Sequence, residues 1–171
     1  MIQTNIAPGS AATLKGVVIR PATSNDADEV YQLITENLVS GHLLPRSLGE
    51  VQLHVPRFRV AAGPAGVIGC GELARLSTTV AEVRSLVVVE AHRGQGLGRR
   101  LLEELVTAAR QQGFPTLCAY THQAHPFVRT GFSIVPHPWV PEKIATDCHT
   151  CRLFRRCHQY AVVLHLGQPV R

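Results

Sequence analysis

Apolar and polar residues alternate along most of the chain, and the period of the alternation changes from one segment to the next. Runs with a period of two and many β-branched residues predict strands at 16–23, 58–62, 67–76, 81–89, 116–120 and 160–166. Runs with a period near 3.6 predict helices at 23–38, 47–55, 97–112 and 124–131. The resulting order β-α-α-β-β-β-α-β-α-β predicts one layered α/β domain over residues 17–171, preceded by a flexible lead-in at 1–16.

A glycine-rich turn joins the predicted strand at 81–89 to the predicted helix at 97–112. Its residues are Arg93-Gly94-Gln95-Gly96-Leu97-Gly98. Free backbone N–H groups at a helix start, together with the helix dipole, favour an anion, and glycine lets the anion approach closely. A plain tight turn would have the same pattern. The spacing does not match the dinucleotide fingerprint G-x-G-x-x-G.

Composition narrows the class of partner. The chain has 171 residues, 45% of them hydrophobic, with a formal net charge of +5 and 5% aromatic residues. The basic residues form no long run and aromatic residues are few, so a phosphate-bearing small molecule is favoured over nucleic acid. Apolar runs are too short to span a bilayer, and the first 16 residues do not resemble a secretory signal. Five cysteines, an odd number, favour a reducing cytoplasm.

A cluster of metal-ligating residue types stands near the C-terminus. Cys148 and Cys151 have a two-residue spacing and are followed by Cys157 and His158. Three cysteines and a histidine suit a tetrahedral zinc site, although a second tight pair is missing. The alternatives are reduced cysteines that act as small apolar residues, or a disulfide between Cys157 and one of the other two.

The segment LVVVEAHRGQGLG resembles the acetyl-CoA motif of the Gcn5-related N-acetyltransferase (GNAT) superfamily, and the later FVRTGF fits the same pattern. The resemblance implies a central, mostly antiparallel mixed sheet flanked by helices on both faces, with its fourth and fifth strands splayed around acetyl-CoA. It also implies that the turn N–H groups hold the pyrophosphate of the cosubstrate, with Arg99 beside it. The pantetheine arm would then lie along Leu86, Val87 and Val88.

From Val18 onward, the chain resembles the N-acetyltransferase domain of N-acetylglutamate synthases, in particular the short forms. That resemblance implies acetylation of L-glutamate, the entry to arginine biosynthesis. It assigns a substrate carboxylate to Arg46, whose planar fork suits bidentate binding, with Leu44 and Ser85 beside the substrate. The Arg-x-Ser that longer relatives carry near the last strand is absent, so the second anchor is unidentified, with Arg155 or Arg156 as candidates. The supporting stretches are GHLLPRSLGEV, VIGCGEL, AEVRSLVVVEAHRGQGLGRRLLEEL and VPEKIATDCHTCRLFRRC.

Acetyl transfer to an amine needs a base, an oxyanion donor and a group beside the leaving sulfur. Glu82 matches the glutamate that the synthase family uses as general base, and a backbone N–H near Val87 or Val88 would face the oxyanion. Phe127 stands where many superfamily members have a proton-donating tyrosine. The synthase family places a hydroxyl at the end of the fifth strand, which makes Thr121 the candidate and Tyr120 its rival; alternation puts the two on opposite faces.

Three functional hypotheses follow. The first is a glutamate N-acetyltransferase that binds acetyl-CoA and L-glutamate but neither nucleic acid nor membranes. A homodimer is compatible with this hypothesis. The second is a GNAT enzyme with another amine acceptor, such as a different amino acid, a polyamine or a protein. The third is a coenzyme A-binding or zinc-binding module without turnover.

Overall fold

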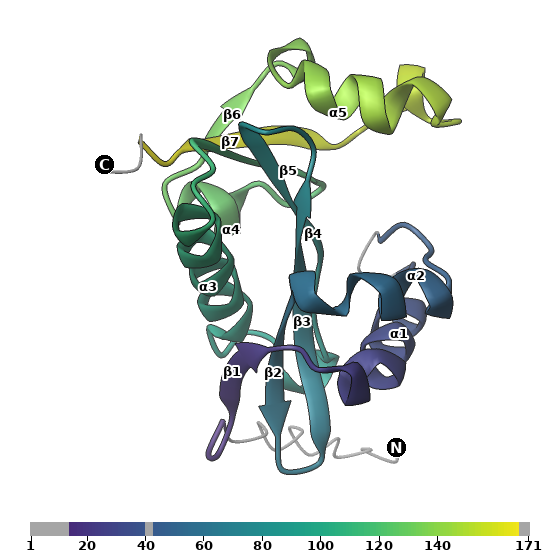
Figure 1. Ribbon diagram of the computed structural model, residues 1–171, viewed down its shortest axis with the longest axis vertical. Coiled ribbons are helices and arrows are strands. Elements are labelled where there is room, and N and C mark those ends of the chain that lie inside the picture. Colours follow the sequence, from purple (N-terminus) through teal and green to yellow (C-terminus); the bar gives the residue numbers. More distant parts are fainter. Residues whose placement is uncertain (1–13, 40–42, 168–171) are drawn as a thin grey trace, which may run out of the picture.

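The computed structural model describes residues 14–39 and 43–167, and these form one seven-stranded sheet in the order β1-β2-β3-β4-β5-β7-β6 (Figure 1). All neighbouring strands are antiparallel except β4 and β5, which are parallel. The strands are β1 (Val18–Pro21), β2 (Phe58–Gly63), β3 (Gly66–Arg75), β4 (Val80–Val88), β5 (Thr116–Thr121), β6 (Ser133–Val135) and β7 (Tyr160–His165). The helices are α1 (Ala27–Glu36), α2 (Leu48–His54), α3 (Leu97–Gln111), α4 (His125–Val128) and α5 (Pro141–Thr146).

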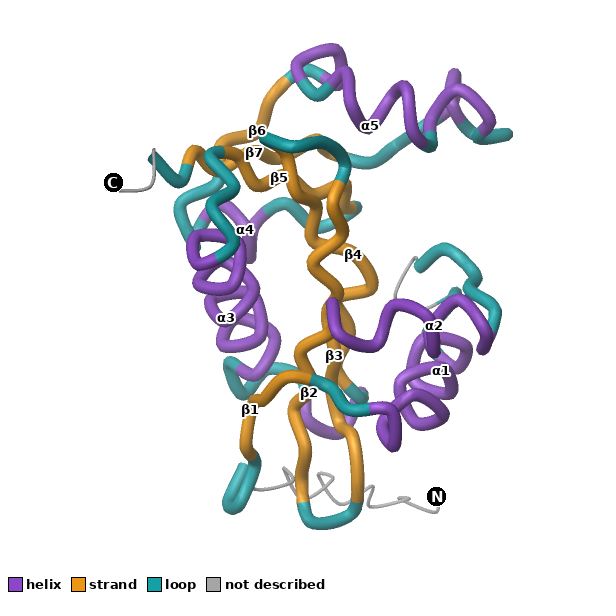
Figure 2. Tube along the Cα trace, in the orientation of Figure 1, coloured by secondary structure: helices purple, strands orange, loops and turns teal. Residues whose placement is uncertain are grey.

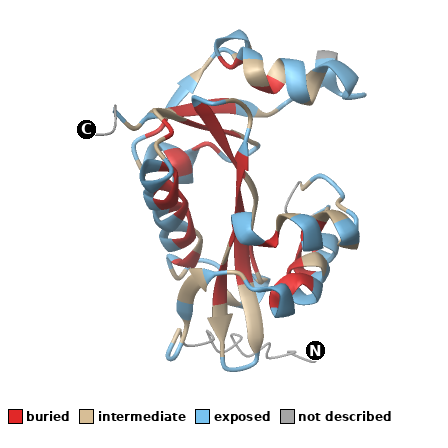
Figure 3. Ribbon diagram, viewed as in Figure 1, coloured by how far each residue is buried: buried red, intermediate tan, exposed pale blue. Residues whose placement is uncertain are grey.

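Helices cover both faces of the sheet, as Figure 2 shows for α3 on one side of β4 and for α1 and α2 on the other. The apolar stripe of α3, with Leu102 and Leu105 fully buried, packs on β3, β4 and β5. On the opposite face, Ile34 of α1 and Val51 of α2 pack against β2, β3 and β4. Figure 3 shows this buried layer as the red inner sides of the helices and the red central strands. The sheet therefore separates two apolar cores, one on each face.

Strand β4 carries a bulge at its middle. Between the pairs Cys70–Val87 and Glu72–Arg84, β4 advances three residues while β3 advances two, and Ser85 has φ 49°. One extra residue reverses which face the following side chains occupy. Val87 therefore packs with α1 and α2 instead of α3. The bulge also interrupts the predicted alternation of the 81–89 segment.

Strands β4 and β5 separate before they end. They pair only where Val80–Val83 lies beside Thr116–Ala119, so the second half of β4 has lost its neighbour on that side. The open edge begins at the bulge. This is the splayed arrangement that the resemblance implies.

The predicted strands and long helices are confirmed, with two omissions. β6 has only three residues, too few to show a period, and α5 begins at Pro141 within a segment that has no apolar stripe. The expected capping box at α2 is half formed. Ser47 accepts the backbone N–H of Glu50, but the Glu50 side chain binds Arg46 instead of turning back to the helix start.

The predicted N-terminal lead-in falls mostly outside the described residues, which begin at Leu14. Leu14 itself packs against a small core cluster that contains Ala61 and Leu97. In the described part of the chain, every helix is too short or too polar to cross a bilayer.

Candidate active site

A cavity of about 680 Å³ lies along the open edge of β4. Its walls come from β4, the end of β5, the glycine turn, the loop before α2, and α5. The predicted site residues that line it are Leu44, Arg46, Glu82, Ser85, Leu86, Val87, Val88, Arg93, Gly94, Gly96, Leu97, Gly98, Arg99, Tyr120 and Thr121. Gln95 does not line it, and its side-chain amide donates to the carbonyl of Ala91. Residues predicted for cosubstrate, substrate and chemistry thus share one cavity.

The glycine turn forms one end of the cavity. Gly94 and Gly96 have φ of 75° and 80°, which L side chains rarely adopt, and Gly96 is the N-cap of α3. The first backbone bond of the helix runs from the N–H of Arg100 to the carbonyl of Gly96 at 3.1 Å. The N–H groups of residues 97–99 precede it and have no partner within the helix, so they can bind an anion.

Arg93 holds this turn in place with its side chain. Its Nε donates to the carbonyl of Val88 at 2.9 Å, and its Nη2 donates to Oδ1 of Asn37 at 2.7 Å. These bonds tie the turn to the end of β4 and to the residue that follows α1. The guanidinium therefore fixes the position of the turn. Arg99 makes a more local contact, because its Nε pairs with Glu103, one helical turn later, at 2.7 Å.

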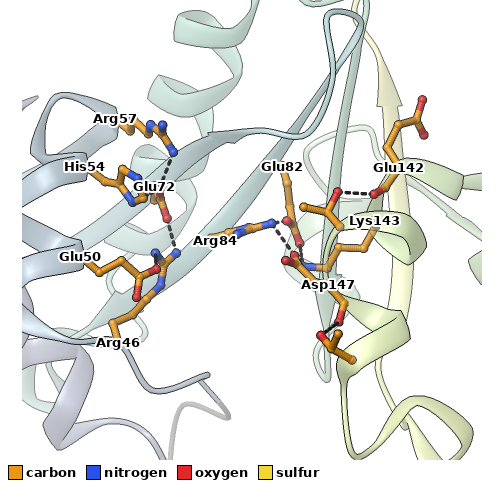
Figure 4. A network of polar contacts seen from close by, with 12 residues as sticks. Arg46, Glu50, His54, Arg57, Glu72, Glu82, Arg84, Glu142, Lys143 and Asp147 are labelled. Carbon is orange, nitrogen blue, oxygen red and sulfur yellow. Dashed lines mark hydrogen bonds and ion pairs between the residues drawn. The ribbon is translucent and has the colours of Figure 1, made fainter.

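Glu82 lies at the other end of the cavity in a network of charges (Figure 4). It is 2% exposed, and its two carboxylate oxygens bind Nε of Arg84 at 2.5 Å and Nζ of Lys143 at 2.7 Å. Asp147 binds both cations, at 2.5 Å and 2.8 Å. Burial opposes the charged form of Arg84, but Glu82 and Asp147 outweigh it and raise the pKa of that guanidinium. Each carboxylate oxygen of Glu82 therefore has a cation of the same chain beside it.

Arg46 is part of a second charge cluster, which faces the first in Figure 4. Its Nη1 lies 2.5 Å from Oε1 of Glu50, and its Nη2 binds Glu72, a carboxylate of β3 that is 1% exposed. Arg57 and His54 lie 3.9 Å from the other oxygen of Glu72. Arg46 is thus buried between two carboxylates of its own chain.

Tyr120 and Thr121 point to opposite faces of β5, as the alternation predicts. The phenol of Tyr120 is directed at the carbonyl of His137, 3.4 Å away, and burial raises its pKa. Its ring lies 5.6 Å from Nζ of Lys143. Thr121 donates to the carbonyl of Gln123 at 3.2 Å and accepts the N–H of the same residue at 3.0 Å. Both hydroxyls thus donate to backbone carbonyls of the same chain.

The acetyltransferase (GNAT) family model matches residues 30–132, which run from within α1 through the glycine turn to the residue before β6. The match covers more than half of the chain, and the fold and the open β4 edge agree with it. The protein belongs to this family.

Two curated relatives are similar to this GNAT protein. An uncharacterized N-acetyltransferase of Chlorobaculum tepidum is 30% identical over 145 residues, 85% of this chain and 94% of the relative. An amino-acid acetyltransferase of Mycobacterium tuberculosis is 29% identical over 119 residues, 68% of each chain. Among solved structures, N-acetylglutamate synthase of Neisseria gonorrhoeae, in complex with coenzyme A and N-acetylglutamate, superposes with a TM-score of 0.75 at 24% identity. The match covers 91% of this GNAT chain and 35% of that longer protein.

Several residues of the GNAT site were not expected from the sequence. Arg84, Glu72, Lys143 and Asp147 complete the charge clusters, although they come from three separate elements and a following loop. A sequence signal existed for one of them. Arg84 follows Glu82 at the two-residue spacing that puts both side chains on one face of a strand.

The zinc site, one of the alternatives for the cysteine cluster, is not formed in the described residues. Within residues 14–39 and 43–167, no three His, Cys, Asp or Glu side chains are placed to hold a metal ion. Cys148, Cys151 and Cys157 are free thiols, and none of them lines the cavity. Arg156, a candidate second anchor, is exposed and also lies outside the cavity lining; the side chain of Arg155 is outside the described residues.

Proposed function

We propose that this protein transfers the acetyl group of acetyl-CoA to the α-amino group of an amino acid, and that L-glutamate is the acceptor. One observation carries the proposal: a single cavity joins an anion-binding glycine turn to an end lined by Arg46, Glu82 and Lys143. Membership in the GNAT family supports the acetyl transfer. The names of the mycobacterial relative and the gonococcal synthase support an amino-acid acceptor.

Acetyl-CoA would bind along the open edge of β4. Its pyrophosphate would accept the N–H groups of residues 97–99, and its amide-rich arm would pair with the backbone of Leu86 to Val88 as an additional strand does. The thioester would then lie where β4 and β5 separate. The acceptor would enter from the opposite end, between the two charge clusters.

The reaction would proceed by direct attack. Glu82 removes a proton from the acceptor ammonium, directly or through a water molecule, and the amine nitrogen then forms a bond to the thioester carbon. Consecutive N–H groups of a strand point to opposite sides, so either Val87 or Val88 would donate to the oxyanion. The carbon–sulfur bond breaks as the amide forms. Coenzyme A leaves as a thiolate, which takes up the second proton that the attacking nitrogen loses, with the Thr121 hydroxyl beside the sulfur.

The substrate carboxylates would bind cations at the acceptor end. Arg46 would hold one carboxylate, with Leu44 and Ser85 beside the substrate. Arg84 and Lys143 are the cations on the opposite wall and are the candidates for the second carboxylate in place of the residues near β7. This reaction would place the protein at the entry to arginine biosynthesis.

Thiol release tests the proposal. Purified protein mixed with acetyl-CoA should release coenzyme A only after L-glutamate is added, and mass spectrometry should identify N-acetylglutamate. Release of coenzyme A with a polyamine or another amino acid, but not with glutamate, would show that the acceptor is that amine. If no amine caused release, the proposal that the protein is an acetyltransferase enzyme would be wrong.

A further inference from the structure

Arg46 already has a carboxylate at the position where a substrate carboxylate would bind. Its guanidinium presents one nitrogen to Glu50 and the other to Glu72, so both arms of the fork are in use. The Arg46 side chain is only 8% exposed. Each of these nitrogens keeps a second N–H, but a carboxylate that binds both of them would lie beside two negative charges, and the departure of one internal carboxylate relieves that repulsion.

The two internal partners differ sharply in their freedom to leave. Glu72 belongs to the central strand β3 and is 1% exposed, with Arg57 and His54 also close to it, so releasing it from Arg46 would leave a charge in the core. The Glu50 side chain is 40% exposed, lies four residues after Arg46, and lines the cavity. Glu50 can turn into solvent, where its charge is hydrated. It is therefore the exchangeable partner.

We propose that Glu50 is an internal competitor for the acceptor's carboxylate, and that it sets the affinity of the Arg46 subsite without taking part in the chemistry. In the empty site, Glu50 keeps the guanidinium neutralised and oriented by binding one arm of the fork. A substrate carboxylate displaces it, while Glu72 keeps hold of the other arm. The inference rests on the proposed function for the identity of the acceptor, but the exchange itself requires only a ligand carboxylate.

Glu50→Gln tests the competition, because the amide has the same size but no charge. The backbone N–H of residue 50 still binds Ser47, so the cap of α2 is retained. The Glu50 carboxylate is partly solvated, and solvated ion pairs contribute about 0.2–1 kcal/mol, so the loss of this pair should lower the KM for L-glutamate by up to about fivefold. The value of kcat and the KM for acetyl-CoA should stay within twofold. A structural role for Glu50 would instead raise the KM or lower the melting temperature.

Glu103→Gln is the matched control. Glu103 makes the same i,i+4 ion pair with an arginine, at 2.7 Å, and its side chain is 46% exposed. It does not line the cavity, so its loss should leave the KM for glutamate unchanged. In the double variant Arg46→Ala with Glu50→Gln, the gain in affinity from the second change should disappear.

Binding of glutarate, a dicarboxylate without an amine, separates this inference from the proposed function. Calorimetric titration into the coenzyme A complex should give a Kd that falls with Glu50→Gln and stays constant with Glu103→Gln. If the wild-type protein fails to acetylate glutamate, the proposed function fails and this titration alone decides the competition. An unchanged or higher Kd in Glu50→Gln, or a gain that persists without Arg46, would overturn it.

Discussion

The two ends of the cavity present different chemical groups. The glycine turn offers backbone N–H groups within one contiguous segment, and its geometry depends on two residues with positive φ, Gly94 and Gly96. The acceptor end offers side-chain charges that α2, β3, β4 and α5 bring together. The first end can bind a phosphate group whatever the acceptor is. On the proposed function, the second end would decide which acceptor fits, because its charges would exchange partners with the ligand.

The difference predicts that substitutions at the two ends affect different kinetic constants. A change at the turn should alter the KM for acetyl-CoA, whereas a change in the charge clusters should alter kcat or the KM for the acceptor. Four predictions, in order of falling effect, test this division.

The largest effect is expected at the proposed base. Glu82→Gln should lower kcat by about 10²–10⁴-fold, the usual contribution of general base catalysis, because the amide cannot accept the proton. Steady-state kinetics at saturating acetyl-CoA measure it. Glu72→Gln is the control, since Glu72 is equally buried and ion-paired but lies outside the cavity lining. Equal losses of kcat in both variants would mean that buried charge pairing, and not proton transfer, is what Glu82 supplies.

The next effect is expected at the carboxylate anchor. Arg46→Lys keeps the charge but removes the fork, and hydrogen bonds to charged groups are worth about 1.5–3 kcal/mol. The KM for L-glutamate should therefore rise about tenfold to a hundredfold, with the KM for acetyl-CoA unchanged. An unchanged KM for glutamate would show that Arg46 serves only to neutralise Glu72.

A smaller effect is expected at the glycine turn. Gly96→Ala and Gly113→Ala both place a side chain at a φ near 80°, and in neither case does the added Cβ meet an atom within 4 Å. Both should lose about 1–2 kcal/mol of stability, measured by denaturant unfolding, because of the left-handed conformation. Only Gly96→Ala should also raise the KM for acetyl-CoA, about tenfold for the loss of one phosphate hydrogen bond. Equal KM values for acetyl-CoA in the two variants would show that the turn does not bind the cosubstrate.

The smallest effect is expected at the end of β5. Thr121 alternates with Leu117 and Ala119, which pack with α3, so its hydroxyl lies on the side of the glycine turn. Thr121→Val should lower kcat by about fivefold, the value of one modest hydrogen bond of about 1 kcal/mol. Tyr120→Phe should leave kcat within twofold, because alternation puts its phenol on the opposite face of β5, where it is directed at the carbonyl of His137. The reverse order would make Tyr120 the group beside the sulfur.

The sequence predicted the backbone-built end far better than the charged end. The turn lies within six consecutive residues, and the strand before it and the amphipathic helix after it have clear periods. The Arg46–Glu72 pair, by contrast, joins residues 26 positions apart, and Arg84 reaches Asp147 across 63 positions. No local period encodes such contacts, since they depend on how β3, β4 and α5 meet in the fold. The zinc interpretation of the cysteines was wrong for the same reason. The spacing of ligand residues along the chain does not guarantee that their side chains meet at one point.

We propose that the carboxylate held by Arg46 is the one on the side chain of the acceptor. The most direct test compares kcat/KM for L-glutamate with that for L-norvaline in the wild-type protein and in Arg46→Lys. L-Norvaline keeps the α-carboxylate but lacks the carboxylate of the side chain. We expect a preference for glutamate of at least about tenfold in the wild type, the value of one charged hydrogen bond, and a much smaller preference in the variant. Equal kcat/KM values for both amino acids in the wild type, or a preference that survives in Arg46→Lys, would contradict it.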